Sequence, residues 1–325
     1  MIVVTGGAGF IGSCLVKELN NSGRADITIV DRLHSGEKWK NLNNLMYEDF
    51  IHADRFMTQD VFSAVLEKAS MVFHLGACSS TTEKDADYLM KNNLGFSKAL
   101  FNICAQKKIP FIYASSGATY GLGENGFSDS DDITDRLRPI NCYGYSKRAF
   151  DSWAISQKST PPVWVGLRFF NVFGPNEYHK EKMRSVVVQA FAQAKEKGEI
   201  RLFNSDNPEY ADGEQLRDFI YVGDVVKAMI QISRLENPKS GIYNLGTGKC
   251  RNFNDLAGAV FSALEMEGKI TYFDMPENLK GQYQYYTCAD MDKFKTLLPR
   301  FEFMGLEESV KDYITNYLDK ENRYY

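Results

Sequence analysis

The sequence predicts an α/β fold in which a parallel sheet is covered by helices on both faces. Short apolar runs alternate with helix-length segments along much of the 325-residue chain. These runs are almost continuously apolar, which is typical of strands buried on both faces of a parallel sheet. Hydrophobic residues make up 44% of the chain and charged residues 25%, so a full globular core can form.

The first 172 residues follow this alternation in order. We expect strands at 1–6, 27–31, 71–77, 110–116 and 163–172, and helices at 9–23, 61–69, 81–107 and 141–157. Gly23 suits the C-terminal end of the first helix because glycine adopts left-handed backbone angles easily. The polar stretch 32–60 carries no strand prediction.

The pattern changes after residue 172. Residues 173–216 contain a lysine-rich loop, a helix at 185–197, a strand-like run at 200–205 and a polar insert at 206–215. A strand–helix–strand pattern returns at 219–232 and 242–248, and a closing helix begins near 306. We therefore predict two interleaved domains, one of 1–172 and 217–248 and a smaller α/β domain of 173–216 and 249–325.

Composition narrows the functional classes. A net charge of −4 and a pI near 5.7 argue against nucleic acid as a main partner. No apolar run approaches the ~20 residues of a membrane span, and the opening strand leaves no room for a signal peptide. The six cysteines form no CxxC pair and the four histidines no metal-binding spacing. We expect a cytoplasmic protein without a metal site.

A glycine-rich turn follows the first predicted strand. Gly6, Gly9 and Gly12 occur in TGGAGFIGS, where the strand ends and a helix begins. Glycines at this place let the backbone approach a pyrophosphate, which the N–H groups of the helix then bind. Asp31 ends the second strand, where an acidic residue contacts a ribose hydroxyl. The sequence thus predicts a Rossmann-type, doubly wound dinucleotide-binding domain.

The residues after Asp31 bear on the form of the cofactor. Asp31 alone favours a free ribose 2′-hydroxyl and hence NAD. Arg32 and Lys38 are cations that could pair with a 2′-phosphate, or could be solvated loop charges. We expect NADP, with NAD as the alternative.

Three residues suggest alcohol–carbonyl chemistry. Tyr143 and Lys147 are four residues apart in a predicted helix, so both lie on one face, whereas Tyr145 lies on another. An ammonium beside a phenol favours the phenolate and is expected to lower the pKa of Tyr143. Ser116 ends a predicted strand and could hydrogen-bond the reacting oxygen. These residues predict an acid–base site beside the dinucleotide.

TGGAGFIG, the strand serine and YGYSK together resemble the extended short-chain dehydrogenase/reductase superfamily. Further motifs resemble the ADP-L-glycero-D-manno-heptose 6-epimerases within it: HLGACSSTTEKDADYLMKNN (74–93), YASSGATYG (113–121), FFNVFGPNEYHK (169–180), RDFIYVGDV (217–225) and LKGQYQYYTCAD (279–290). The motifs extend across nearly the whole chain. The resemblance implies epimerisation at C6 of an ADP-heptose for the lipopolysaccharide inner core, and a homo-oligomer, with pentamers familiar among relatives.

The resemblance also implies roles for individual residues. Lys180 matches a second catalytic base that works with Tyr143 on two orientations of the sugar; by its own context it could equally be a surface lysine. The implied cofactor residues are Phe10, Ile11, Asp31, Arg32, Lys38, Leu75, Gly76, Ala77, Cys78, Ser79, Asn92, Lys147 and His179. The implied substrate residues are Ser116, Asn171, Lys182, Gln189, Phe203, Asn204, Ser205, Arg217 and Tyr283. Arg32, Leu75, Gln189 and the 206–215 insert depart from the family pattern.

Three other functions stay open at this level. A UDP- or dTDP-sugar epimerase or dehydratase would share the fold, although SSGATYG lacks the acidic pair that dehydratases place after the strand serine. A non-catalytic NADP-binding regulator would not need Ser116, Tyr143 and Lys147 together. A one-way reductase would need only one proton-transfer group, so Lys180 would have no catalytic role in it.

Overall fold

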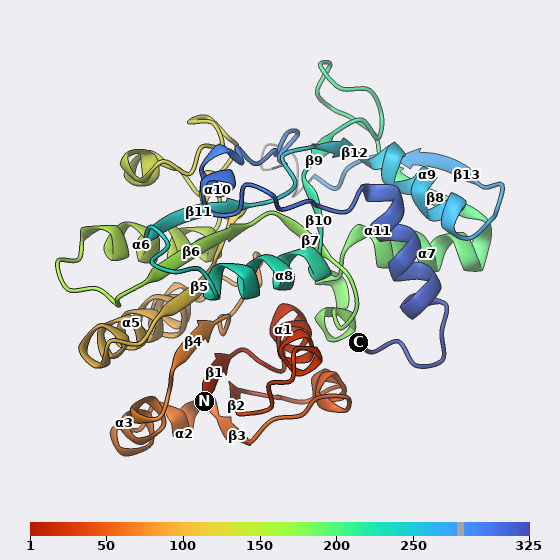
Figure 1. The fold of residues 1–325 in the computed structure, drawn as a ribbon. Helices are drawn as coiled ribbons and strands as arrows, with labels where there is room; N and C mark the ends of the chain where they lie inside the picture. The colour runs from red at the N-terminus through yellow and green to blue at the C-terminus, as the bar shows by residue number, and fades with distance from the viewer. Residues whose placement is uncertain (278–282) are drawn as a thin grey trace.

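A seven-stranded parallel sheet forms the centre of the computed structural model, which describes residues 1–277 and 283–325 (Figure 1). Its strands are β1 (Ile2–Thr5), β2 (Ile27–Asp31), β3 (Asp49–His52), β4 (Met71–His74), β5 (Phe111–Ser116), β6 (Trp164–Phe169) and β11 (Gly241–Leu245). Their order is β11-β6-β5-β4-β1-β2-β3, and every neighbouring pair is parallel. The predicted doubly wound α/β fold is confirmed.

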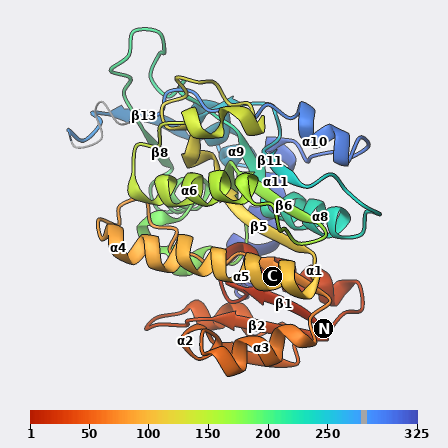
Figure 2. The same cartoon turned by 90° about the vertical axis from the view of Figure 1, so that its left-hand side faces the viewer.

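Helices cover both faces of this sheet (Figures 1 and 2). One face packs on α1 (Phe10–Asn21) and α8 (Val222–Ser233), and the other on α3 (Gln59–Glu67), α5 (Phe96–Lys107) and α6 (Cys142–Ser156). Alternate strand residues point to opposite faces. Val3 and Val72 therefore join the core beneath α5 and α6, whereas Val4 and Phe73 join the core that contains α1 and α8.

The structure corrects two strand predictions. The polar stretch 32–60 contains β3, an edge strand whose side chains are all partly or largely exposed, so its sequence lacks the apolar run of a buried strand. The single strand expected at 163–172 is wrong. The chain leaves the main sheet at Phe170, and β7 (Asn171–Phe173) pairs instead with β10 (Phe219–Tyr221).

A smaller group of elements lies beyond the carboxyl ends of the central strands (Figure 1). Here β8 (Glu199–Phe203) pairs with β13 (Lys269–Phe273), and β9 (Leu216–Arg217) with β12 (Arg251–Asn252). Helices α7 (Val186–Lys197), α9 (Phe253–Ala263) and α11 (Leu306–Tyr313) pack together beside them. The helices expected at 185–197 and from 306 are confirmed. The division into two domains stays a prediction.

The remaining elements are short. They are the helices α2 (Ala53–Phe56), α4 (Ala86–Leu89) and α10 (Asp292–Leu297), the 3-10 helices Lys38–Leu42, Gly117–Tyr120, Asp131–Arg136 and Tyr178–Met183, and the π-helical segments Met90–Gly95 and Ile314–Leu318. Over the described ranges, none of the helices has the length and apolar character needed to cross a membrane.

Candidate functional site

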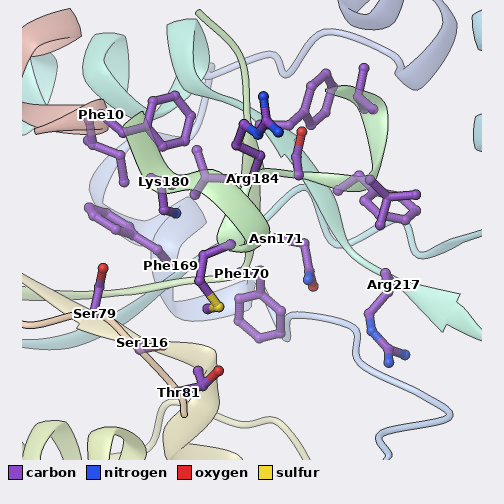
Figure 3. A pocket seen from close by; sticks show the side chains of 18 of the residues that line it. Phe10, Ser79, Thr81, Ser116, Phe169, Phe170, Asn171, Lys180, Arg184 and Arg217 are labelled. Carbon is purple, nitrogen blue, oxygen red and sulfur yellow. The ribbon is translucent and has the colours of Figure 1, made fainter. Parts of the chain in front are cut away.

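One cavity of about 700 Å³ joins the central sheet to the smaller group of elements. It opens at the carboxyl ends of β1, β4, β5 and β6 and extends to β8, β9 and α9. Chain order reverses at β1, because β2 lies on one side of it and β4 on the other. Open α/β sheets bind ligands at this kind of switch point. Figure 3 shows side chains from both sides of the cavity, including Ser116, Lys180 and Arg217.

The glycine-rich turn forms one end of the cavity. Gly6 has a φ of +71°, and a Cβ there would lie 2.7 Å from the backbone nitrogen of Gly76. A Cβ on Gly12 would lie 2.1 Å from the carbonyl oxygen of Gly6. Helix α1 starts directly afterwards, and among the described residues no side chain caps its first N–H groups. The turn therefore leaves backbone donors free for a pyrophosphate, as a dinucleotide requires.

The carboxylate of Asp31 is already engaged in this structure. One oxygen accepts a hydrogen bond from the Ala8 N–H at 2.9 Å, and the other accepts from the Arg32 N–H at 2.7 Å and from the Lys38 ammonium at 2.6 Å. The Arg32 guanidinium pairs with Asp54 at 2.7 Å and donates to Asn92 at 2.9 Å. Lys38 thus contacts the carboxylate directly, whereas the Arg32 guanidinium is held away from it by Asp54 and Asn92.

Ser116, Tyr143 and Lys147 lie together on the cavity wall. The Lys147 ammonium donates to the Ala114 carbonyl at 2.8 Å and lies 6.0 Å from the centre of the Tyr143 ring. Burial lowers the pKa of Lys147 to about 8, although the charge of Asp151 opposes this. Tyr145 is 46% exposed, as its different helical face predicts.

The expected fall in the pKa of Tyr143 does not occur in this structure. Burial raises this pKa, and hydrogen bonding with Ser116 opposes the rise only in part. The reason is that the phenol is enclosed while the Lys147 ammonium is held by the Ala114 carbonyl rather than by the phenol. Tyr143 is therefore a neutral phenol in the protein alone.

A buried ion pair anchors the helix that carries Tyr143 and Lys147. Arg168 on β6 contacts Asp151 on α6 at 3.0 Å, and both side chains are fully buried. The Asp151 carboxylate also accepts hydrogen bonds from Tyr113 at 3.0 Å and Ser115 at 2.8 Å. Because Asp151 lies one helical turn beyond Lys147, this network fixes the position of α6 on the sheet, and with it the positions of Tyr143 and Lys147.

Lys180 enters the cavity from the loop after β7. Its ammonium lies 5.4 Å from the centre of the Phe10 ring, and Figure 3 shows it pointing into the hollow between Phe10 and Phe169. Burial lowers the pKa of Lys180, and the charge of Glu177 opposes this. The neighbouring His179 has a pKa lowered to about 4 by burial and by the charges of Lys38 and Lys180. Lys180 is thus a partly desolvated base, not a surface lysine.

The Lys180 loop is held by a buried carboxylate that the sequence did not reveal. Glu177 accepts hydrogen bonds from the Gly174 N–H at 3.2 Å, the Ser185 hydroxyl at 2.7 Å and the Tyr313 hydroxyl at 3.2 Å, as well as from the Ser185 N–H. Burial raises its pKa. The carboxylate joins both ends of the loop to α11.

Asn176, also buried, ties the same loop to the beginning and the end of the described chain. Its amide donates to the Ser13 hydroxyl on α1 at 2.9 Å, and its side-chain oxygen accepts from the Tyr325 N–H at 2.9 Å. Farther along the loop, Glu181 has a φ of 48° and a ψ of −115°, angles that a residue with a side chain rarely adopts. The backbone next to Lys180 is therefore strained and firmly anchored.

Arg217 lies at the far end of the cavity. Its guanidinium is 5.6 Å from the centre of the Phe253 ring and 5.0 Å from that of Tyr283. The residue is only 7% exposed, and burial lowers its pKa. Within residues 1–277 and 283–325, no carboxylate appears among the groups that act on its charge. An enclosed guanidinium of this kind suits an anionic ligand.

The charge of the cavity wall differs from that of the whole chain. The cationic side chains on the wall are Lys38, Lys147, Lys180, Arg184, Arg201 and Arg217, whereas Asp31 supplies a carboxylate. The protein as a whole has a net charge of −4. Such a concentration of positive charge favours ligands that carry several phosphates.

Comparison with known proteins agrees with this architecture. Residues 2–246 match the model of the NAD dependent epimerase/dehydratase family. The chain belongs to this family. An ADP-L-glycero-D-manno-heptose-6-epimerase of Nitratidesulfovibrio vulgaris (strain DP4) is 50% identical over 319 residues, which cover 98% of either protein.

Two solved structures of epimerases are also similar. The ADP-L-glycero-D-manno-heptose-6-epimerase of Helicobacter pylori has a TM-score of 0.79 and 32% identity, covering 97% of this chain and 95% of that one. A UDP-N-acetylglucosamine 4-epimerase of Methanobrevibacter ruminantium has the same TM-score, with 28% identity and coverage of 97% and 98%. The shared fold is therefore compatible with more than one sugar nucleotide.

In this family member, the cavity brings together most of the residues predicted from the sequence. Those on its wall are Gly6, Gly9, Phe10, Ile11, Gly12, Asp31, Lys38, Leu75, Gly76, Ala77, Ser79, Ser116, Tyr143, Lys147, Asn171, His179, Lys180, Gln189, Phe203, Arg217 and Tyr283. Leu75 and Gln189, which depart from the family pattern, are among them. The wall also includes residues that the sequence did not suggest, such as Thr81, Arg201 and Gln215.

Six predicted residues, all in the described part of the chain, are not among those on the wall: Arg32, Cys78, Asn92, Lys182, Asn204 and Ser205. Asn204 donates to Asp274 at 2.9 Å, and Lys182 is exposed on its loop. Residues 279–282 of the LKGQYQYYTCAD motif lie outside the described residues.

Proposed function

We propose that this protein is an ADP-L-glycero-D-manno-heptose 6-epimerase. It would convert ADP-D-glycero-D-manno-heptose into its C6 epimer, for the heptose of the lipopolysaccharide inner core. The observation that carries the proposal is Lys180, a second partly desolvated base on the same cavity as Tyr143. The 50% identity to a curated heptose epimerase over 98% of the chain supports this choice of substrate.

The residues fit a nicotinamide dinucleotide, and we propose NADP rather than NAD. Gly6 and Gly12 let the turn pack tightly against Gly76 and against itself, where a Cβ would collide with backbone atoms, and the first N–H groups of α1 stay open to a pyrophosphate. Lys38 occupies an oxygen of Asp31 that a ribose hydroxyl would otherwise use, and it brings a positive charge to that place. Arg32 would turn from Asp54 to pair with a 2′-phosphate. The family description, which names NAD, supports a nicotinamide cofactor.

When bound, the oxidised nicotinamide supplies a hydride acceptor for C6 and a positive charge beside the phenol. Tyr143 would exchange a proton with the C6 oxygen, and Ser116 would hydrogen-bond that oxygen. Lys147 would bring a positive charge near the phenol from the same helical face. Its pKa of about 8 keeps much of it charged near neutrality, which favours the phenolate as the proton leaves.

Lys180 gives the second half of the reaction its own proton carrier. Inversion requires hydride to return to the opposite face of the transient ketone, so the sugar must turn over within the cavity. Tyr143 cannot be correctly placed for both orientations. Lys180 reaches the cavity from the loop opposite Ser116 (Figure 3), and because burial lowers its pKa, its ammonium is a better proton donor than that of an exposed lysine.

The far end of the cavity would hold the nucleotide while the sugar turns. Arg217 can bind two oxygens of a diphosphate with its planar guanidinium. Asn171, on β7, is also on the cavity wall, and Figure 3 shows it between Arg217 and Lys180. A fixed diphosphate with a mobile sugar would allow the exchange of faces without release.

The test mixes the purified protein with ADP-D-glycero-D-manno-heptose and no added cofactor, resolves the C6 epimers by chromatography and follows nicotinamide absorbance. We expect an equilibrium mixture of epimers without net reduction of cofactor. If nothing converts, the assay is repeated with NADP and with NAD. Continued failure, or reduction of cofactor in step with substrate loss, would refute the proposal.

Two variants then assign the bases. Tyr143→Phe and Lys180→Met should each lower turnover by at least ~100-fold, the usual scale of acid–base catalysis, while NADP stays bound. Tyr145→Phe and Lys197→Met are the matched controls, because both side chains are exposed. Full activity in Lys180→Met would point to a one-base reaction. Conversion of a UDP- or dTDP-sugar in place of the ADP-heptose would favour another epimerase of the family.

A further inference from the structure

Gln215 lies beside Arg217 at the far end of the cavity, and nothing in the sequence patterns assigned it a role. Both residues are on the cavity wall. The segment is extended, because Leu216 exchanges backbone hydrogen bonds with Tyr285 at 2.8 Å and Thr287 at 3.1 Å. Residues two apart on an extended segment point to the same side. The side chains of Gln215 and Arg217 are therefore neighbours that face the same space.

The amide of Gln215 is buried without a partner for its nitrogen. The residue exposes 1% of its surface, and within the described residues its Nε2 makes no hydrogen bond. Buried donors are almost always paired in folded proteins, because an unpaired one loses its hydration without compensation. A donor left open on a cavity wall therefore indicates an acceptor that arrives with the ligand.

The connection before Gln215 holds this amide in place. The Phe253 N–H, at the start of α9, donates to the Gly213 carbonyl at 2.9 Å. Gly213 has a φ of +74°, and a Cβ there would lie 2.2 Å from the Asn254 side chain. Tyr210, from the same insert, stacks on Tyr285 with ring centres 5.5 Å apart. The insert thus fastens Gln215 to α9 and to the tyrosine-rich segment.

The neighbouring groups identify the chemistry of the acceptor. Arg217 has donors and no acceptor, and aromatic rings cover the faces of its guanidinium. Two adjacent donor groups suit a ligand part that only accepts hydrogen bonds. A diphosphate does so, whereas the edge of a nucleobase presents both donors and acceptors. Positive charge on the wall favours the diphosphate again.

We propose that Gln215 is a further substrate-binding residue, which donates a hydrogen bond to a diphosphate oxygen of the nucleotide sugar next to Arg217. This rests on the proposed function, because it takes the substrate to be a nucleotide sugar. The role is to hold the diphosphate from a second direction, so that the nucleotide stays fixed while the sugar turns.

The test measures ADP binding by calorimetry to the NADP-loaded protein and its variants. Gln215→Met keeps the length of the side chain and removes the donor. We expect ADP affinity to fall about 10- to 100-fold, the usual loss for a hydrogen bond to a charged group. Gln215→Glu keeps the shape but puts a negative charge beside the diphosphate, and should bind ADP more weakly than Gln215→Met. Glu214→Gln, a change at the exposed neighbouring residue, should stay within about twofold.

Each alternative outcome is distinct. The proposal is overturned if Gln215→Met binds ADP within twofold of the wild-type affinity. It is also overturned if Gln215→Glu binds ADP as tightly as Gln215→Met or more tightly, because the amide would then contact the adenine. NADP affinity and thermal unfolding show which variants are folded. If Gln215→Glu folds and Gln215→Met does not, the ADP affinity of Gln215→Glu is compared with that of Glu214→Gln: a clear loss in Gln215→Glu alone supports the proposal, and equal affinities overturn it. A wild-type protein that does not bind ADP would refute the proposed function itself.

Discussion

Replacing Lys147 with methionine should stabilise the fold while it removes activity. Lys147 is 7% exposed, and its ammonium has the Ala114 carbonyl as a hydrogen-bond acceptor. Burial lowers its pKa from 10.5 to about 8. A lysine whose folded-state pKa is lowered carries a free-energy cost for being charged inside the protein, and methionine fills a similar volume without that cost.

The size of the effect follows from the two pKa values. At 1.36 kcal/mol per pH unit, a pKa of about 8 instead of 10.5 corresponds to about 3 kcal/mol against folding at neutral pH. Methionine also leaves the Ala114 carbonyl without its partner, which costs about 1–2 kcal/mol. The variant should therefore be more stable than the wild type by about 1–2 kcal/mol near pH 7.

The dependence on pH separates this charge effect from packing. Below pH 8 both the folded and the unfolded wild type hold the proton, so the full cost is present. Between pH 8 and 10.5 the folded state loses its proton first, and the stability of the wild type rises relative to the variant. From pH 7 to pH 10 this relative gain should be about 2–3 kcal/mol, enough to reverse the order of stability.

Urea unfolding of both cofactor-free proteins at pH 7 and pH 10 is the assay, with equal m-values as the check that the midpoints are comparable. A Lys147→Met variant that is less stable than the wild type at pH 7 would contradict the argument. A difference between the proteins that does not change with pH would contradict it as well, because the charge of Lys147 would then cost nothing.

Three further changes test the rest of the site. Gly12→Ala should weaken NADP binding about 10- to 100-fold, measured by calorimetry, because its Cβ overlaps the glycine turn. Asp151→Ala should lower the free energy of unfolding in urea by about 3–5 kcal/mol, since it leaves the buried guanidinium of Arg168 unpaired. The exposed control Asp132→Ala should lower it by less than about 1 kcal/mol. Equal losses in the two variants would contradict this account. Glu177→Gln removes a charge that raises the pKa of Lys180. Lys180 must carry the proton that it gives to the C6 oxygen when hydride returns, so the alkaline limb of the rate profile should move to lower pH; an unmoved limb would show that the Glu177 carboxylate does not act on Lys180.

The sequence predicted the parts of the fold that follow from local rules. These parts are the glycine turn, the acidic end of β2 and the Tyr143–Lys147 spacing. Each depends on residues close together in the chain, so the sequence pattern predicts it directly. Strand β3 was missed because it lies at the sheet edge and its side chains are largely solvated. The break at Phe170 was missed because an apolar run looks the same whether it continues in one sheet or moves to another.

The unpredicted parts of the site are polar residues whose partners lie far along the chain. Glu177 contacts Tyr313, 136 residues later, and Asp151 and Arg168 come from a helix and a strand that the sequence alone does not pair. Gln215 lies in an insert without periodicity. Burial of these side chains arises from tertiary contacts, and local sequence carries no signal for it.

The anchoring of the Lys180 loop has a consequence for the order in which the protein is made. Gly6, Tyr143 and Lys147 belong to the first half of the chain, whereas the contacts that hold the loop reach Tyr313 and Tyr325. A growing chain on the ribosome could therefore assemble the dinucleotide end early, and would fix Lys180 only when the last helix emerges. Tyr143 and Lys180, the two candidate bases, would therefore come to face one cavity only after the C-terminal residues of the chain have been made.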